Sequence, residues 1–95
     1  MAKDVSLPKC NLYLEGSGLD TNGNKVVKVS FPNSRAFSIQ TSGNLPNTGR
    51  ILRGLKTKKD MNSVSTSDLT KISKEVCAYV KEFGSVAQKK KLRSS

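Results

Sequence analysis

The amphipathic stretch SDLTKISKEVCAYVKEFG, residues 67–84, is the strongest structural signal in this sequence. Its apolar residues recur mostly at spacings of three or four, which places them on one stripe of a helix with 3.6 residues per turn. The stripe consists of Leu69, Ile72, Val76, Tyr79, Val80 and Phe83. Ser67 suits the N-cap and Gly84 suits the position after the last turn. The pattern predicts a helix over about residues 67–83 that must bury this stripe.

Three stretches before this helix alternate apolar and polar residues, as half-buried strands do. They cover about residues 9–15, 25–31 and 35–41. The last two flank the tight-turn sequence Pro32-Asn33-Ser34, so they predict an antiparallel hairpin. Residues 16–24, rich in glycine and asparagine, are predicted to form a loop. A short helical turn capped by Asn47 or Thr48 is expected near residues 50–56.

A sheet with one apolar face and a helix with one apolar stripe each supply the surface that the other must bury. We therefore predict an α+β fold of β-β-β order, a three-stranded antiparallel sheet with the C-terminal amphipathic helix packed on one face in two layers. A chain of 95 residues suits one domain. We expect it to span residues 1–84, with a basic tail over residues 85–95. The helix stripe should pack on the sheet residues Leu12, Leu14, Val27, Val29, Phe31, Phe37 and Ile39.

Positive charge is concentrated in two short segments. The formal net charge is +10. Residues 50–59 hold five cations and residues 85–95 hold four, and neither segment contains an acid. The two segments therefore account for nine of the ten excess charges. Such blocks oppose compaction of the chain and indicate a polyanionic partner.

Few side chains suited to catalysis or metal binding are present. Histidine is absent, which removes the commonest general base and the commonest metal ligand. Two cysteines alone cannot form a tetrahedral zinc site. The stretch DTNGNK begins like a calcium loop at Asp20, but Lys25 and Phe31 stand where that loop needs glycine and a bidentate glutamate. We expect no enzymatic activity, no metal and no cofactor.

The stretch GNLPNTGRI, residues 43–51, invites comparison with a nucleotide-binding phosphate loop. Five residues rather than four separate Gly43 from Gly49, and Arg50 and Ile51 replace the required Lys and Ser/Thr. A nucleotide site of that kind is therefore excluded. Backbone N–H groups near Thr48 and Gly49 could still hold one phosphate oxygen, and the alternative is a simple loop and cap.

Cys10 and Cys77 are interpreted as reduced, partly buried thiols of a cytoplasmic protein. No apolar run approaches the roughly 20 residues needed to cross a bilayer. Asp4 and Pro8 interrupt anything like an apolar signal region. Disulfides are rare in the cytosol, so we expect none here.

The charge clusters predict a small non-enzymatic binding protein whose partner is the phosphate backbone of DNA or RNA, and we expect a duplex. The basic tail would act as a mobile electrostatic arm. The sheet face away from the helix would offer polar groups to phosphates or bases, from Tyr13, Lys28, Ser30, Ser38 and Gln40. The predicted contact residues are Lys28, Arg35, Arg50, Arg53, Lys56, Lys58, Lys59, Lys89, Lys90, Lys91 and Arg93.

The same charge clusters also fit two other kinds of partner. The first alternative is a protein-interaction or inhibitor module that docks on an acidic protein. The second is the surface of an anionic membrane, although the tail lacks the bulky apolar face that an interfacial helix needs.

Overall fold

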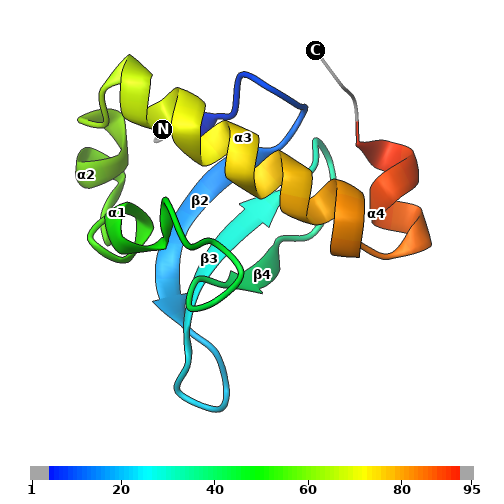
Figure 1. Cartoon of the computed structure of the whole chain (residues 1–95), viewed down its shortest axis with the longest axis horizontal. Helices are drawn as coiled ribbons and strands as arrows, with labels where there is room; N and C mark the ends of the chain where they lie inside the picture. The colour runs from blue at the N-terminus through cyan, green and yellow to red at the C-terminus, as the bar shows by residue number, and fades with distance from the viewer. Residues whose placement is uncertain (1–4, 93–95) are drawn as a thin grey trace.

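An antiparallel sheet crossed on one face by a long helix forms the body of the molecule in a computed structural model, which describes residues 5–92 (Figure 1). The strands are β1 (Val5–Ser6), β2 (Tyr13–Leu19), β3 (Lys25–Ser30) and β4 (Phe37–Gln40), adjacent in chain order. The helices are α1 (Gly49–Arg53), α2 (Lys58–Asn62), α3 (Thr66–Phe83) and α4 (Val86–Lys91). The α+β class with an antiparallel sheet and C-terminal helices is confirmed. The expected number of strands is wrong, because the sheet has four.

The additional strand is β1, which is too short for a residue alternation to show. It pairs with β2 through Val5 opposite Leu14 and Ser6 opposite Tyr13. The Leu7 N–H donates to the Leu12 carbonyl at 2.9 Å, which closes the connection between the two strands. Residues 9–12 belong to this connection, so the strand expected over residues 9–15 begins later, at Tyr13.

The strand β2 continues through Gly16–Leu19, where a loop was expected. The pairing register with β3 shifts between Leu14 and Gly16, and Gly16 has φ 143°, a conformation that favours glycine. This β-bulge absorbs one residue and lets pairing continue to Leu19. The loop therefore shrinks to residues 20–24, where Asp20 Oδ1 accepts hydrogen bonds from two backbone N–H groups within the loop.

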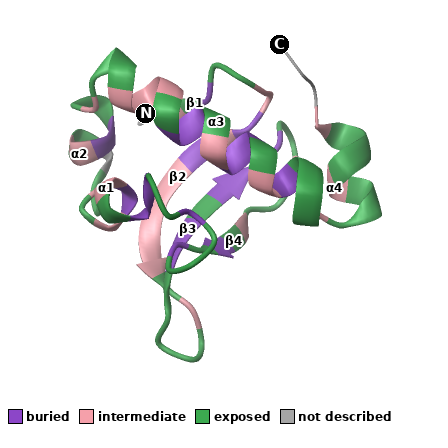
Figure 2. Cartoon of the chain, viewed as in Figure 1, coloured by how far each residue is buried: buried purple, intermediate pink, exposed green. Residues whose placement is uncertain are grey.

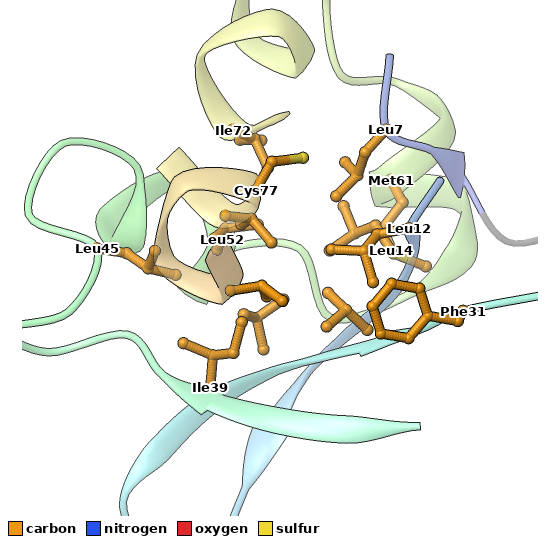
Figure 3. Packing of buried hydrophobic residues seen from close by; sticks show 14 residues of the cluster. Leu7, Leu12, Leu14, Phe31, Ile39, Leu45, Leu52, Met61, Ile72 and Cys77 are labelled. Carbon is orange, nitrogen blue, oxygen red and sulfur yellow. The ribbon is translucent and has the colours of Figure 1, made fainter. Parts of the chain in front are cut away.

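The core lies between the sheet and α3, and α1 and α2 also contribute to it (Figures 2 and 3). The buried cluster contains Leu7, Leu12, Leu14, Val27, Val29, Phe31, Ile39, Leu45, Leu52, Met61, Ile72, Val76, Cys77 and Val80. Phe37, Leu69 and Tyr79 are only partly buried against it. Phe83 is 71% exposed, so its expected place in the core is wrong. The last buried residue of α3 is Val80, which means that the apolar stripe runs one turn beyond the core.

The ends of α3 differ slightly from expectation. Ser65, rather than Ser67, is the N-cap, and its side chain accepts a hydrogen bond from the Asp68 N–H. Gly84 is the C-cap with φ −68°, so it does not take the left-handed conformation. A Cβ at Gly84 would lie 2.5 Å from the Val80 carbonyl oxygen. The backbone approaches too closely there for any side chain, which explains why the residue is glycine.

Cys10 and Cys77 form a disulfide, with their Cα atoms 6.2 Å apart. The expectation of two reduced thiols is therefore wrong. The bond joins the connection before β2 to the middle of α3, two segments whose proximity only the folded chain reveals. Disulfides are typical of oxidising compartments, so the cytoplasmic expectation loses the support that it took from reduced thiols. Separately, none of the helices within residues 5–92 combines the length and apolar character needed to span a membrane.

Candidate nucleic-acid interface

Apart from Lys28 on β3, the expected cations of the described chain fall into two groups, one on the α1 and α2 side of α3 and the other on the α4 side (Figure 1). One group, here called the α1 cluster, lies on α1, on α2 and on the link between them. It contains Arg50, Arg53, Lys56 and Lys59. The other, the α4 cluster, contains Lys89, Lys90 and Lys91 together with Arg35 in the turn before β4. The side chain of Lys58 and the whole of Arg93 lie outside the described part of the chain. The two groups are therefore separate surfaces and not the two halves of one patch.

The α1 cluster is held against the sheet by β2. The Leu55 carbonyl accepts hydrogen bonds from the Ser17 N–H at 3.2 Å and the Ser17 hydroxyl at 3.0 Å. These bonds fix the segment that carries Arg53 and Lys56 beside the end of β2. The β-bulge at Glu15 shifts the register of β2 just before Ser17, so it sets which residues of β2 meet this segment.

A pocket of about 420 Å³, here called the β2 pocket, lies where these segments meet. It is lined by Ser17, Gly18, Leu19, Lys25, Arg53 and Lys56. A Cβ placed on Gly18 would lie 4.0 Å from the Lys28 Nζ, so that ammonium group lies close to the pocket. Three of the lining residues, Lys25, Arg53 and Lys56, are cations, and they come from two distant parts of the chain. Sequence reasoning missed Lys25, because nothing in the sequence brings the start of β3 next to α1.

A second depression, here called the α1 hollow, adjoins the β2 pocket through Arg53. Its volume is about 470 Å³, and it is lined by Thr41, Ser42, Gly43, Leu45, Pro46, Asn47, Arg50, Ile51 and Arg53. The loop of residues 41–48 packs closely on the start of α1. A Cβ on Gly49 would lie 2.7 Å from the Thr41 carbonyl oxygen, so only glycine fits there without a shift of the backbone.

The start of α1, where Thr48 and Gly49 were considered as a weaker candidate for holding a phosphate oxygen, is occupied by the carboxylate of Glu75. Glu75 Oε1 accepts from the Thr48 N–H at 2.8 Å and from the Thr48 hydroxyl at 2.6 Å. The Asn47 N–H and side-chain amide also donate to this carboxylate. Partial burial alone would raise the pKa of Glu75, but these hydrogen bonds outweigh burial and lower the pKa below its ordinary value. Glu75 thus satisfies the donors that a phosphate would have used.

Two further carboxylates are also bound to backbone N–H groups. Asp60 accepts from the Thr57 N–H at 3.1 Å and the Lys56 N–H at 3.2 Å, and bonds from the Thr57 backbone and hydroxyl lower its pKa, with a smaller contribution from Lys59. Asp20 accepts from the backbone of its own loop. Among the described side chains, neither these two carboxylates nor Glu75 accepts a hydrogen bond from a lysine or arginine side chain. These three carboxylates therefore form no side-chain hydrogen bond with Arg50, Arg53 or Lys56 in the described part of the chain.

The α4 cluster lies on a helix that packs against the body. Asn11 Nδ2 donates to the Lys91 carbonyl at 2.8 Å, and Lys91 Nζ donates to Ser34 Oγ at 3.1 Å. Leu92 packs against the core cluster. Lys89, Lys90 and Lys91 are exposed (Figure 2). They form a basic surface beside Arg35, on a helix where a tail without secondary structure of its own would have been freer to move.

The open face of the sheet carries most of the expected polar groups. Tyr13 pairs with Ser30, Lys28 with Ser38, and Val26 with Gln40, so each pair shares the face opposite the core. Lys28, Ser38 and Gln40 are exposed. Ser30 is only 5% exposed and Val26 only 1%, so little of their surface is available to a ligand.

The largest of the three hollows, here called the α3 groove, contains residues that sequence reasoning assigned elsewhere. It has a volume of about 840 Å³ and is lined by Asn44, Asn47, Lys71, Lys74, Glu75, Ala78, Tyr79, Glu82 and Phe83. The rings of Tyr79 and Phe83 have their centroids 5.3 Å apart. The helical periodicity that assigned both rings to the core could also have shown Lys71 and Lys74 on the flanking stripe.

Comparisons of the chain with protein-family models, with curated proteins and with solved structures found no match. The candidate interface is therefore defined by geometry: the α1 cluster around the β2 pocket and the α1 hollow, the α3 groove beside them, and the separate α4 cluster.

Proposed function

We propose that the protein binds the phosphate backbone of a nucleic acid, DNA or RNA, with the α1 cluster as its main contact surface. The observation that carries the proposal is the convergence of Lys25, Arg53 and Lys56 on the β2 pocket, with Lys28 beside it. Cations gathered in this way repel one another, and an anion bound among them relieves that repulsion. A chain of phosphates can neutralise several of them at once.

The chemistry of the α1 cluster suits phosphate. Arg50 and Arg53 line the α1 hollow, and an arginine fork can bind two phosphate oxygens at once. The lysines act as point charges on the same backbone. Contacts of this kind give affinity without selectivity for sequence. The α4 cluster, at the other end of α3, adds a second and weaker electrostatic contact.

The salt dependence of binding tests this proposal. If Lys25, Lys28, Arg50, Arg53, Lys56 and Lys59 all contact phosphates, log K should fall with log salt at a slope of about −5 for a duplex and about −4 for a single strand. Fluorescence anisotropy with a labelled oligonucleotide measures this slope. The triple variant Arg50→Gln, Arg53→Gln, Lys56→Gln should make the slope shallower by about 2 to 3.

The α4 cluster supplies a matched control. The triple variant Lys89→Gln, Lys90→Gln, Lys91→Gln removes the same charge from the other end of the molecule and should change the slope by about 1 or less. Equal effects of the two variants would show a general charge effect and contradict the assignment of the site. A slope near zero in the unmodified protein would contradict backbone binding altogether. Such a result would favour an acidic protein partner.

A further inference from the structure

The three hollows lie next to one another in a row, here called the depression, because neighbouring hollows share a lining residue. Asn47 lines both the α3 groove and the α1 hollow, and Arg53 lines both the α1 hollow and the β2 pocket. The depression therefore runs from the outer face of α3, past the start of α1, to the end of β2. Cations lie along its whole length, namely Lys71, Lys74, Arg50, Arg53, Lys56 and Lys25.

The α3 groove differs from the rest of the depression because it contains aromatic rings. Its α3 residues follow one another at spacings of three and one, so they form a single face of the helix. Phe83 is 71% exposed and its ring packs on that of Tyr79, which is itself partly buried. An exposed aromatic pair beside lysines is the arrangement on which unpaired bases stack.

We propose that a single-stranded nucleic acid lies along this depression, with its phosphates on the α1 cluster and one or two bases stacked on Tyr79 and Phe83. This inference rests on the proposed backbone binding and adds the form of the strand. A duplex keeps the faces of its bases stacked on each other, so only an unpaired base can cover these rings. The exposed Asn44 amide, which can both donate and accept, faces the same groove and suits the edge of a base.

The two carboxylates of the α3 groove have different consequences for a bound strand. Glu75 accepts hydrogen bonds from Asn47 and Thr48, so its oxygens are already held by N–H and O–H donors. Glu82 is exposed and lines the groove, where it repels a phosphate. The variant Glu82→Gln should therefore bind a single strand about twofold to fivefold more tightly, an effect within the range of a partly screened surface charge.

Tyrosine fluorescence reports directly on the stacking step. The chain has two tyrosines and no tryptophan, so the variant Tyr13→Phe leaves Tyr79 as the only strong emitter. Titration with an oligothymidylate of about 12 nucleotides should quench the Tyr79 emission, because a base stacks on the ring. Inorganic polyphosphate carries the charge without bases, so it should bind the α1 cluster and leave the Tyr79 emission nearly unchanged.

Two equally exposed apolar residues provide the mutational test. Phe83 and Val86 are each 71% exposed, and only Phe83 lines the groove. Phe83→Ala should weaken oligothymidylate binding about tenfold, whereas Val86→Ala should change it less than about twofold, within the ordinary scatter of surface substitutions. Neither variant should alter the affinity for polyphosphate.

The outcomes separate this inference from the function on which it rests. If oligothymidylate and polyphosphate both bind, but Tyr79 is not quenched and Phe83→Ala has no effect, base stacking is wrong and backbone binding stands. A duplex that binds more tightly than the single strand would overturn the inference in the same way. If neither polyanion binds, both proposals are wrong.

Discussion

Glu75 is the residue that most clearly couples charge to structure in this molecule. The pKa of Glu75 is lowered in the fold. Its hydrogen bonds therefore stabilise the fold fully at pH values above about 4.3, the pKa of a glutamate in the unfolded chain. That stabilisation is lost as the pH falls through the still lower folded pKa. We expect Glu75→Gln to reduce the free energy of unfolding at pH 7 by about 1–3 kcal/mol. The same variant should lose less stability than the unmodified protein between about pH 5 and pH 3.

Urea unfolding at a series of pH values between 3 and 7, followed by circular dichroism, measures both effects. Glu82→Gln is the matched control, since it removes an exposed acid from the same helix face and should leave the stability at pH 7 nearly unchanged. Asp20 and Asp60, whose pKa values are also lowered, should retain part of the acid dependence in every variant. If Glu75→Gln and the unmodified protein lose stability in parallel, the carboxylate does not anchor the loop.

Among the elements, the connection before β2 and the helix α3 are joined covalently. The disulfide between Cys10 and Cys77 restricts the unfolded chain across a separation of 67 residues. We expect the double variant Cys10→Ser, Cys77→Ser, or the reduced protein, to lose about 2–4 kcal/mol of stability. Urea unfolding with and without a thiol reductant measures this loss. Two titratable thiols in the native, non-reduced protein would contradict the bond.

The elements also show what the sequence could predict. The helix α3 was predicted to within a residue or two because its apolar stripe extends over four turns. The strand β3 was predicted because Val27 and Val29 alternate with Lys28 and Ser30. The strand β2 was misplaced because residues 9–12 alternate like a strand but form the connection from β1, and because the glycines of residues 16–19 are typical of a loop. The strand β1 was missed because two residues carry no pattern.

The candidate site was predictable only in part, for related reasons. The acid-free run of residues 50–59 identified Arg53 and Lys56, but their meeting with Lys25 depends on the bond between Ser17 and Leu55. Glu75 lies 27 residues from Thr48, so nothing local showed that the start of α1 was occupied. The helical periodicity showed which face of α3 carries Phe83, but it could not show that the buried part of that face ends at Val80.

For the whole molecule, the dominant physical feature is a net charge of +10 on a body about 30 Å across. Raising the ionic strength from about 0.01 M to about 0.1 M shortens the Debye length from about 30 Å to about 10 Å, so charges at opposite ends of α3 stop repelling each other. We expect the melting temperature to rise by about 4 °C over this range.

Thermal unfolding by circular dichroism at the two salt concentrations tests this expectation. The triple variants of the α1 and α4 clusters each remove three charges, so both should show a smaller rise than the unmodified protein. A melting temperature that falls with added salt would mean that attractive pairs, and not repulsion between cations, dominate the electrostatics of the fold.

The link between Cys10 and Cys77 also closes most of the backbone into a ring. Within that ring lies the tip of the β2–β3 hairpin, where Asn22 and Gly23 are exposed and open to proteases. A single cut there would leave both fragments attached, and the nicked molecule could keep its sheet and its groove. Release of the fragments would then require a reductant as well as a protease.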